Sequence, residues 1–210
     1  MNYNPRIHHR RSIRLRGYDY SHAGMYFVTF VTGKRKYLFG RTAGSALELN
    51  AAGSMVSDAW ISVSSRFHGV IIDCFVIMPN HAHGVIVLTR GPVGFAMAPV
   101  GYNDADNDGE EGKRTALGDV VYHLKSFTID RYREGVKDLQ WERYAGRVWQ
   151  KNYYERIIRD SEELVRIRNY VKQNPENWIL DRENPERVGD DPFDVWLDSV
   201  GGMQIATSKT

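Results

Sequence analysis

Two histidines, His81 and His83, are candidates for a chemical role in this chain. A single alanine separates them. They follow a Met-Pro-Asn turn and open a run rich in β-branched residues, which is typical of a strand. Side chains alternate between the two faces of a strand, so both imidazoles are expected on one face. Two imidazoles on one face can chelate a single metal ion. The pair indicates a reaction only if a nucleophile and a nucleic-acid surface lie beside it.

A helix expected at 160–173 could supply a phenol and an amide to the same site. Its buried stripe is predicted from three apolar residues, Leu164, Ile167 and Val171. Tyr170 and Asn174 lie one turn apart beside that stripe, so they are expected on one flank of the helix. The alternative is a tyrosine at the edge of the core, followed by a polar residue at the helix end before Pro175.

The elements that must position these groups follow from the periodicity of the apolar residues. Strands are expected at 25–32, 70–78, 81–88 and 148–158, and helices at 49–67, 117–133 and 160–173. The order β-α-β-β-α-β-α predicts an α+β fold, a ferredoxin-like split βαβ sandwich. In this fold an antiparallel sheet has helices packed on it, and the tyrosine helix comes after the last strand. Asp160 and Glu163 predict a capping box at the start of that helix.

The composition predicts one domain with extensions over the 210 residues. Residues 1–20 are expected to form a basic arm, residues 21–178 the folded domain, and residues 179–210 a C-terminal tail. Within the domain, residues 90–115 are rich in Gly, Pro and Asp, which predicts a flexible loop.

Positive charge is concentrated at the start of the chain, although the net charge is only +2. No acidic residue precedes Asp19, whereas the arm carries several arginines. Such an arm suits contact with phosphates, and the alternative is a solvated, disordered terminus. The single cysteine, Cys74, lies in an apolar strand pattern and is expected to be a buried thiol. Without a disulfide framework or a long apolar run, we expect a cytoplasmic protein.

Three stretches of the sequence, taken together, resemble the single-tyrosine HUH transposases. They are His81-Ala82-His83 after its Met-Pro-Asn turn, the run from Trp149 to Asp160, and Tyr170-Val171-Lys172-Gln173-Asn174-Pro175. Within that family the chain looks most like the REP-associated tyrosine transposases, which have an insertion sequence 200-like domain. The stretch 11–20 also looks like that branch, and the resemblance covers roughly Arg11 to Trp178.

The resemblance implies a metal-dependent endonuclease and strand transferase acting on single-stranded DNA. It implies that His81 and His83 bind a divalent metal, Mg or Mn, with Asn174 as a further ligand where relatives often carry Gln. It implies that Tyr170 is the nucleophile that forms a 5′-phosphotyrosine. A tyrosine ester conserves the energy of the phosphodiester, so a 3′-hydroxyl can rejoin the strands without a nucleotide cofactor. A bound metal would polarise the scissile phosphate and help the phenol, whose pKa is about 10, to lose its proton.

The implied partner is single-stranded DNA with a hairpin nearby, and no membrane is expected. A channel lined by basic and aromatic residues binds single strands through backbone charge and base stacking. The candidate DNA contacts are Arg10, Arg11, Arg14, Arg16, Lys125, Arg131 and Lys151, with Lys34, Arg35 and Lys36 as further candidates. The alternative for each of them is a solvated surface charge that takes no part in DNA binding.

Several alternatives stay open from the sequence. Tyr153 and Tyr154 are rival nucleophiles by residue type, although the family pattern places the nucleophile on the helix. A second hypothesis for the function is a non-catalytic regulator that binds single-stranded DNA. A cupin-like metal barrel is a third, which the helix-rich order disfavours. The sequence leaves the DNA target, the choice between monomer and homodimer, and the choice between a mobile-element protein and a host protein undecided.

Overall fold

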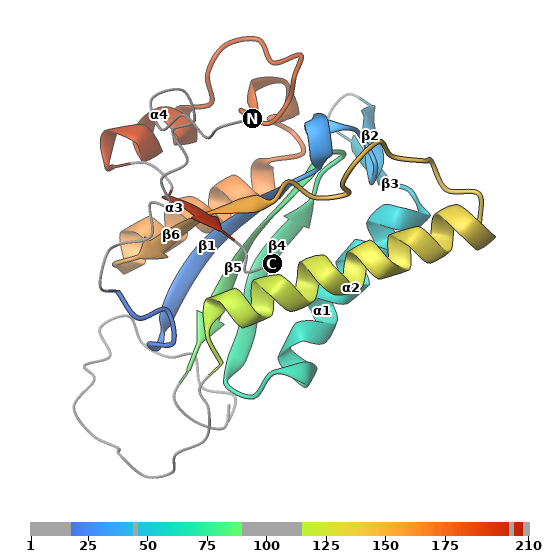
Figure 1. Ribbon diagram of the computed structural model, residues 1–210. Coiled ribbons are helices and arrows are strands. Elements are labelled where there is room, and N and C mark those ends of the chain that lie inside the picture. Colours follow the sequence, from blue (N-terminus) through green and yellow to red (C-terminus); the bar gives the residue numbers. More distant parts are fainter. Residues whose placement is uncertain (1–17, 44–45, 90–114, 202–203, 208–210) are drawn as a thin grey trace, which may run out of the picture.

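The computed structural model describes residues 18–43, 46–89, 115–201 and 204–207 (Figure 1). Within them, a five-stranded sheet has the order β4-β5-β1-β6-β7, and neighbouring strands are antiparallel. Its strands are β1 (Gly24–Val31), β4 (Val70–Ile77), β5 (His81–Leu88), β6 (Asn152–Ile158) and β7 (Gln204–Thr207). The helices are α1 (Ala51–Arg66), α2 (Leu117–Asp138), α3 (Ser161–Gln173) and α4 (Pro192–Ser199). A small hairpin of β2 (Gly40–Ala43) and β3 (Ala46–Leu49) stands apart from the sheet, and short 3-10 turns lie at Gly33–Arg35 and Trp178–Leu180.

The order β1-α1-β4-β5-α2-β6 confirms the predicted split βαβ arrangement. β1 is the central strand and pairs with β5 on one side and with β6 on the other. In that register Thr29 lies opposite His83 on β5 and opposite Tyr154 on β6. These three side chains therefore share one face of the sheet.

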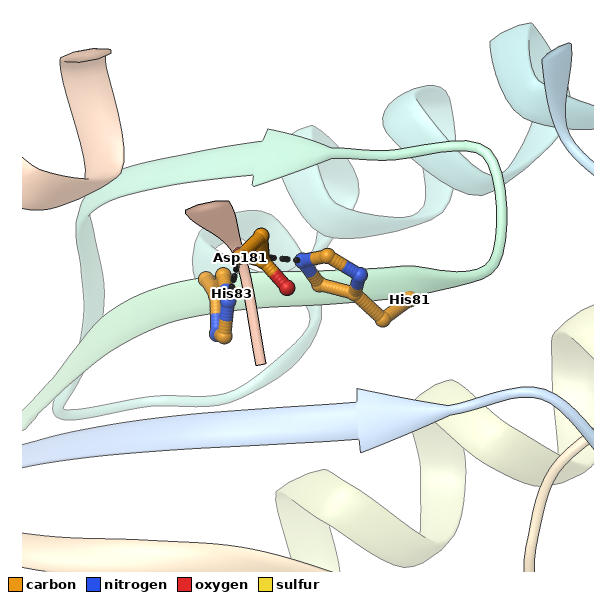
Figure 2. Close-up of side chains that lie close together, drawn as sticks. All are labelled: His81, His83 and Asp181. Atoms are coloured by element: carbon orange, nitrogen blue, oxygen red, sulfur yellow. Dashed lines mark ion pairs between the residues drawn. The ribbon is translucent and has the colours of Figure 1, made fainter. Parts of the chain in front are cut away.

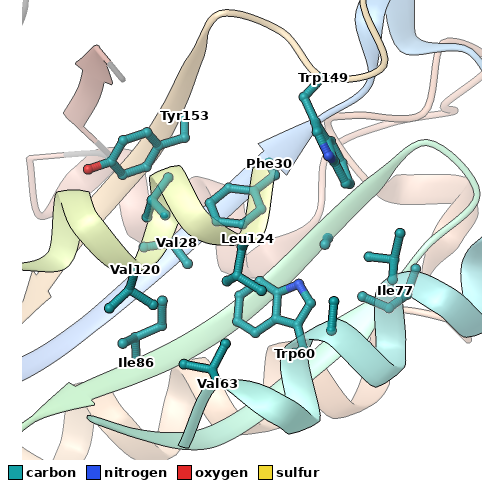
Figure 3. Packing of buried hydrophobic residues seen from close by; sticks show 14 of the residues in the cluster. Val28, Phe30, Trp60, Val63, Ile77, Ile86, Val120, Leu124, Trp149 and Tyr153 are labelled. Atoms are coloured by element: carbon teal, nitrogen blue, oxygen red, sulfur yellow. The ribbon is translucent and has the colours of Figure 1, made fainter. Parts of the chain in front are cut away.

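The larger core lies between the sheet and the helices α1 and α2 (Figure 3). Trp60 on α1 stacks on Phe75 of β4, with ring centroids 5.6 Å apart and an interplanar angle of 11°. This packing depends on Gly84 of β5, because a Cβ there would lie 2.4 Å from the Trp60 ring. The glycine directly after the histidine pair thus lets a tryptophan cover the sheet opposite the imidazoles.

Helix α3 covers the other face of the sheet. The predicted stripe of Leu164, Ile167 and Val171 is buried there together with Phe27 and Val85. The predicted cap is confirmed in one half, because Asp160 accepts a hydrogen bond from the Glu163 backbone at 2.8 Å. The Glu163 carboxylate does not return to Asp160 but accepts from the Arg159 backbone and from the Arg156 side chain.

The C-terminal segment differs from the prediction of a tail over 179–210. β7 pairs with the edge of β6, so it extends the sheet beyond the four predicted strands. Helix α4 packs on α3 through Phe193, whose ring stacks on Tyr170. Neither element has a local signal, because α4 spans eight residues and β7 four, too few for apolar periodicity to show. The segment after residue 178 therefore carries two short elements that contact the rest of the described chain.

Cys74 is half-buried and not fully buried, because β4 is an edge strand of the sheet. Residues 90–114 of the expected loop and residues 1–17 of the expected arm lie outside the described residues. Among the described helices, none combines the length and the apolar character needed to cross a membrane.

Candidate functional site

The histidine pair lies on the sheet face that α3 covers. His81 and His83 alternate along β5 with Ala82, which belongs to the core under α1 and α2. Both imidazoles are buried, and their ring centroids are 4.3 Å apart. The prediction that one strand would present both rings to the same face is confirmed.

Asp181 joins the two histidines to form a buried cluster (Figure 2). Its Oδ2 atom lies 3.8 Å from His81 Nε2 and 3.8 Å from His83 Nε2. One potential ligand atom from each of the three residues lies within 4.8 Å of the others, a spacing that could hold a metal ion. Burial lowers the pKa of His81 to about 4, so this imidazole is neutral near neutral pH. Burial opposes ionisation of Asp181, but the two histidines and the Asn174 amide hold the pKa of its carboxyl below the usual range.

Tyr170 on α3 reaches this cluster with its hydroxyl. The hydroxyl donates to Asp181 Oδ2 at 3.1 Å and lies 3.1 Å from His83 Nε2. Its ring is held by Phe193, which stacks on it with centroids 4.0 Å apart and an interplanar angle of 13°. Burial, reinforced by the Asp181 carboxylate, raises the pKa of Tyr170 well above the ordinary value. The phenol is therefore protonated in the resting cluster.

Asn174 lies at the end of α3, fully buried next to the same carboxylate. Its Nδ2 atom donates to Asp181 Oδ2. Its Oδ1 atom, like His81 Nε2, is buried without a hydrogen-bond partner in the described part of the chain. Unsatisfied buried acceptors are costly, so this pair of atoms is suited to a cation. The structure thus gathers His81, His83, Tyr170 and Asn174, although their roles stay predictions.

The rival tyrosines lie elsewhere. Tyr153 is 1% exposed in the core under α1 and α2, on the opposite face of the sheet from the histidines. Tyr154 shares the face of His83 but stands two strands away, about 10 Å at the usual strand spacing. An open pocket of about 690 Å³ reaches Tyr154, Tyr170 and His83. Tyr154 is therefore near the candidate site without contacting the cluster.

The DNA-contact candidates within the described residues differ in their burial and in the groups that they contact. Lys125 is buried, and its ammonium donates to the carbonyl oxygens of Gln150 at 2.6 Å and Lys151 at 3.2 Å. Burial lowers the pKa of Lys125 to about 8. The charge of Lys125 therefore faces the protein and not the solvent. Arg131 is exposed on α2 and pairs with Glu134 at 2.9 Å.

The remaining candidates are divided between the surface and the undescribed arm. Lys151 is exposed at the start of β6. Arg35 pairs with Glu183 at 2.9 Å, and Lys36 lies 3.6 Å from Glu142. Lys34 is exposed in the turn before them. The four arginines of the arm, Arg10, Arg11, Arg14 and Arg16, lie outside the described residues.

Asp181 is the site residue that the sequence analysis missed. It follows the apolar 3-10 turn Trp178–Leu180, in a stretch without periodicity. The Trp178 ring lies stacked near His81, with centroids 5.9 Å apart, and this contact brings Asp181 to the cluster. An acidic residue directly after a short apolar turn, seven positions beyond Asn174, is the signal that could have drawn attention to it.

Fold and site together define an α+β protein with a split βαβ core and a buried His-His-Asp cluster beside a tyrosine. The chain is 37% identical over 180 residues to an uncharacterized protein from Haemophilus influenzae. The matched residues cover 86% of this chain and 96% of the relative. At this level of identity the chain belongs to the same family as that protein. A scan against protein-family models found no match.

The solved structures that are similar to this chain include the following two. A structure of a REP-associated tyrosine transposase bound to a REP hairpin is 18% identical, with a TM-score of 0.48, over 77% of this chain and 72% of that one. A protein from Deinococcus radiodurans with a provisional transposase assignment is 14% identical, with a TM-score of 0.43, over 76% of this chain and 95% of that one. Both of these proteins are named as transposases.

Proposed function

We propose that this chain is a transposase, a metal-dependent endonuclease and strand transferase for single-stranded DNA. Tyr170 would form a 5′-phosphotyrosine intermediate at sites next to a hairpin. The observation that carries the proposal is the position of the Tyr170 hydroxyl, 3.1 Å from both His83 Nε2 and Asp181 Oδ2. A nucleophile of this kind needs a group within hydrogen-bond reach that can take its proton. The resemblance of the sequence to single-tyrosine transposases supports the same assignment.

The donor set of the cluster fits a divalent ion such as Mg²⁺ or Mn²⁺. His81 and His83 would supply imidazole nitrogens, Asp181 a carboxylate oxygen, and Asn174 an amide oxygen. The fit is supported by two buried atoms, His81 Nε2 and Asn174 Oδ1, which have no hydrogen-bond partner among the described residues. When bound, the metal would offset the charge of the scissile phosphate.

The chain's own residues would supply the nucleophile and its base. The Tyr170 hydroxyl donates a hydrogen bond to Asp181 Oδ2 and lies 3.1 Å from His83 Nε2, so these are the two groups within reach of its proton during attack. As the phenolic oxygen bonds to phosphorus, the P–O3′ bond breaks, and the 3′ oxygen takes up a proton and leaves as a hydroxyl. Attack by a DNA 3′-hydroxyl on the phosphotyrosine reverses these steps and rejoins two strands.

A basic groove beside α2 is the proposed surface for a further part of the DNA. It has a volume of about 340 Å³ and lies between α2 and the segment that leads into β6. The residues proposed to contact DNA there are Tyr122, Arg133, Tyr144, Arg147 and Lys151. Tyr122 is exposed and can stack on a base, while the cations can contact phosphates. The nearby Arg131 and the arginines of the arm would add to the same electrostatic attraction.

One observation favours the alternative of a non-catalytic regulator that binds single-stranded DNA. Tyr170 is only 5% exposed beneath Phe193, so DNA does not reach its hydroxyl in this conformation. A regulator needs the DNA-binding surface but no accessible nucleophile. A transposase requires that Phe193 move away from Tyr170 when DNA binds.

The two functions are separated by a covalent trapping assay. The full-length protein is incubated with end-labelled hairpin DNA that carries single-stranded flanks, in Mn²⁺ or in a chelator, and run on a denaturing gel. A transposase gives a protein–DNA adduct in Mn²⁺ and none in the chelator. Retention of the hairpin on a native gel, without an adduct over a panel of flanking sequences, would support the regulator.

A further inference from the structure

Asn80, the residue before the first histidine, is fully buried and has a fixed orientation. Its Nδ2 atom donates to the Glu183 carbonyl at 2.7 Å and to the Arg35 carbonyl at 3.3 Å. Carbonyl oxygens only accept hydrogen bonds, so the amide nitrogen must face them. The Oδ1 atom therefore faces His81 Nδ1, 2.8 Å away. Because an amide oxygen also only accepts, Nδ1 of His81 must carry the proton, which leaves Nε2 as a lone pair.

His83 has a partner of a different kind. Its Nδ1 atom lies 2.7 Å from Thr29 Oγ1, and a hydroxyl can either donate or accept. Since the Tyr170 hydroxyl donates to Asp181, its oxygen can accept a hydrogen bond from His83 Nε2. The proton of a neutral His83 can therefore sit on either nitrogen, and Thr29 can adapt to both forms. Of the two histidines, His81 is the one whose proton is fixed by its neighbour.

The Asp181 carboxylate opposes the form of His81 that has its proton on Nδ1 and a lone pair on Nε2. Asp181 Oδ2 lies 3.8 Å from His81 Nε2, so a proton on Nε2 would be attracted to the carboxylate. A lone pair at the same place faces negative charge and is unfavourable until a cation lies between them. The bond from His81 to Asn80 is the interaction that keeps the proton on the far nitrogen.

We propose that Asn80 is a positioning residue that holds the His81 proton on Nδ1 and so keeps Nε2 ready to bind a metal ion. The proposal rests on the metal site of the proposed function. Because Asn80 also bonds the Glu183 carbonyl, it connects the histidine strand to the segment that carries Asp181. Partners of this kind typically change metal affinity by roughly 10- to 100-fold when they are removed.

The test is the tautomer of His81 in the metal-free, full-length protein, read from long-range ¹H–¹⁵N NMR correlations. The wild-type protein should show His81 with its proton on Nδ1. Asn80→Ala should move the proton to Nε2 and weaken Mn²⁺ binding, measured by calorimetry, by roughly 10- to 100-fold. Thr29→Val is the matched control, because it removes the partner of His83 and should leave the His81 tautomer unchanged.

Two results would overturn the proposal. One is a wild-type spectrum with the His81 proton on Nε2, which decides the matter even if Asn80→Ala fails to fold. The other is a folded Asn80→Ala protein that keeps both the Nδ1 proton and the wild-type Mn²⁺ affinity. Absence of a DNA adduct would count against the transposase alone, since the tautomer and the Mn²⁺ affinity are measured without DNA.

Discussion

Replacing Tyr170 with phenylalanine removes one oxygen atom from the candidate site and leaves the ring in place. The stack on Phe193 and the edge contact with Phe27 are retained, so no large cavity opens. The losses are the hydrogen bond to the charged Asp181 carboxylate, worth roughly 1.5–3 kcal/mol, and the hydrogen bond to His83, worth roughly 0.5–1.5 kcal/mol. Asp181 keeps the Asn174 amide and the Glu183 backbone N–H, the latter at 2.6 Å. We therefore expect the free energy of unfolding to fall by about 2–4.5 kcal/mol, from these two bonds.

The covalent adduct, in contrast, should disappear completely in Tyr170→Phe, because the missing oxygen is the proposed point of attachment. The assay combines denaturant unfolding with the trapping gel in Mn²⁺, and hairpin binding should survive. Tyr154→Phe is the matched control in the same pocket, and Tyr153→Phe is the control in the core. Both controls should still form the adduct. If Tyr170→Phe still traps DNA while Tyr154→Phe does not, the nucleophile has been assigned to the wrong tyrosine.

Three further predictions follow from other parts of the chain. His81→Ala combined with His83→Ala should keep the circular dichroism spectrum and lose Mn²⁺ binding and cleavage, so unchanged Mn²⁺ affinity by calorimetry would rule out the metal site. Deletion of residues 1–16 should weaken DNA binding and reduce its salt dependence, because fewer counterions are released; an equal salt slope would show that the arm takes no part. Gly84→Ala should lower the free energy of unfolding by about 1–3 kcal/mol through its clash with Trp60, and a melting temperature equal to the wild type would contradict this packing.

The parts of the fold that sequence could predict are those with a local periodicity. Alternation along β5 placed His81 and His83 on one face, and helical spacing gave the buried stripe of α3 beside Tyr170. Both patterns depend on neighbours within a few residues, so one chain suffices to read them.

Asp181 could not be placed in this way, because its position depends on contacts that are distant in sequence. The Trp178 ring beside His81 and the Asn80 bond to the Glu183 carbonyl fix the segment that carries it. The surroundings of Lys125 could not be predicted for the same reason, because only tertiary structure brings carbonyl groups from the segment around the start of β6 to this helix.

The position of Asp181 in the chain has a consequence for the order in which the cluster is made. Asp181 follows every helix and strand of the split βαβ unit, whereas the histidine strand comes early. During synthesis, a chain can fold its N-terminal part before the rest has emerged. Such a nascent chain would hold the two imidazoles without their carboxylate partner. The complete cluster therefore requires the chain through Asp181, well beyond the strand that carries the two histidines.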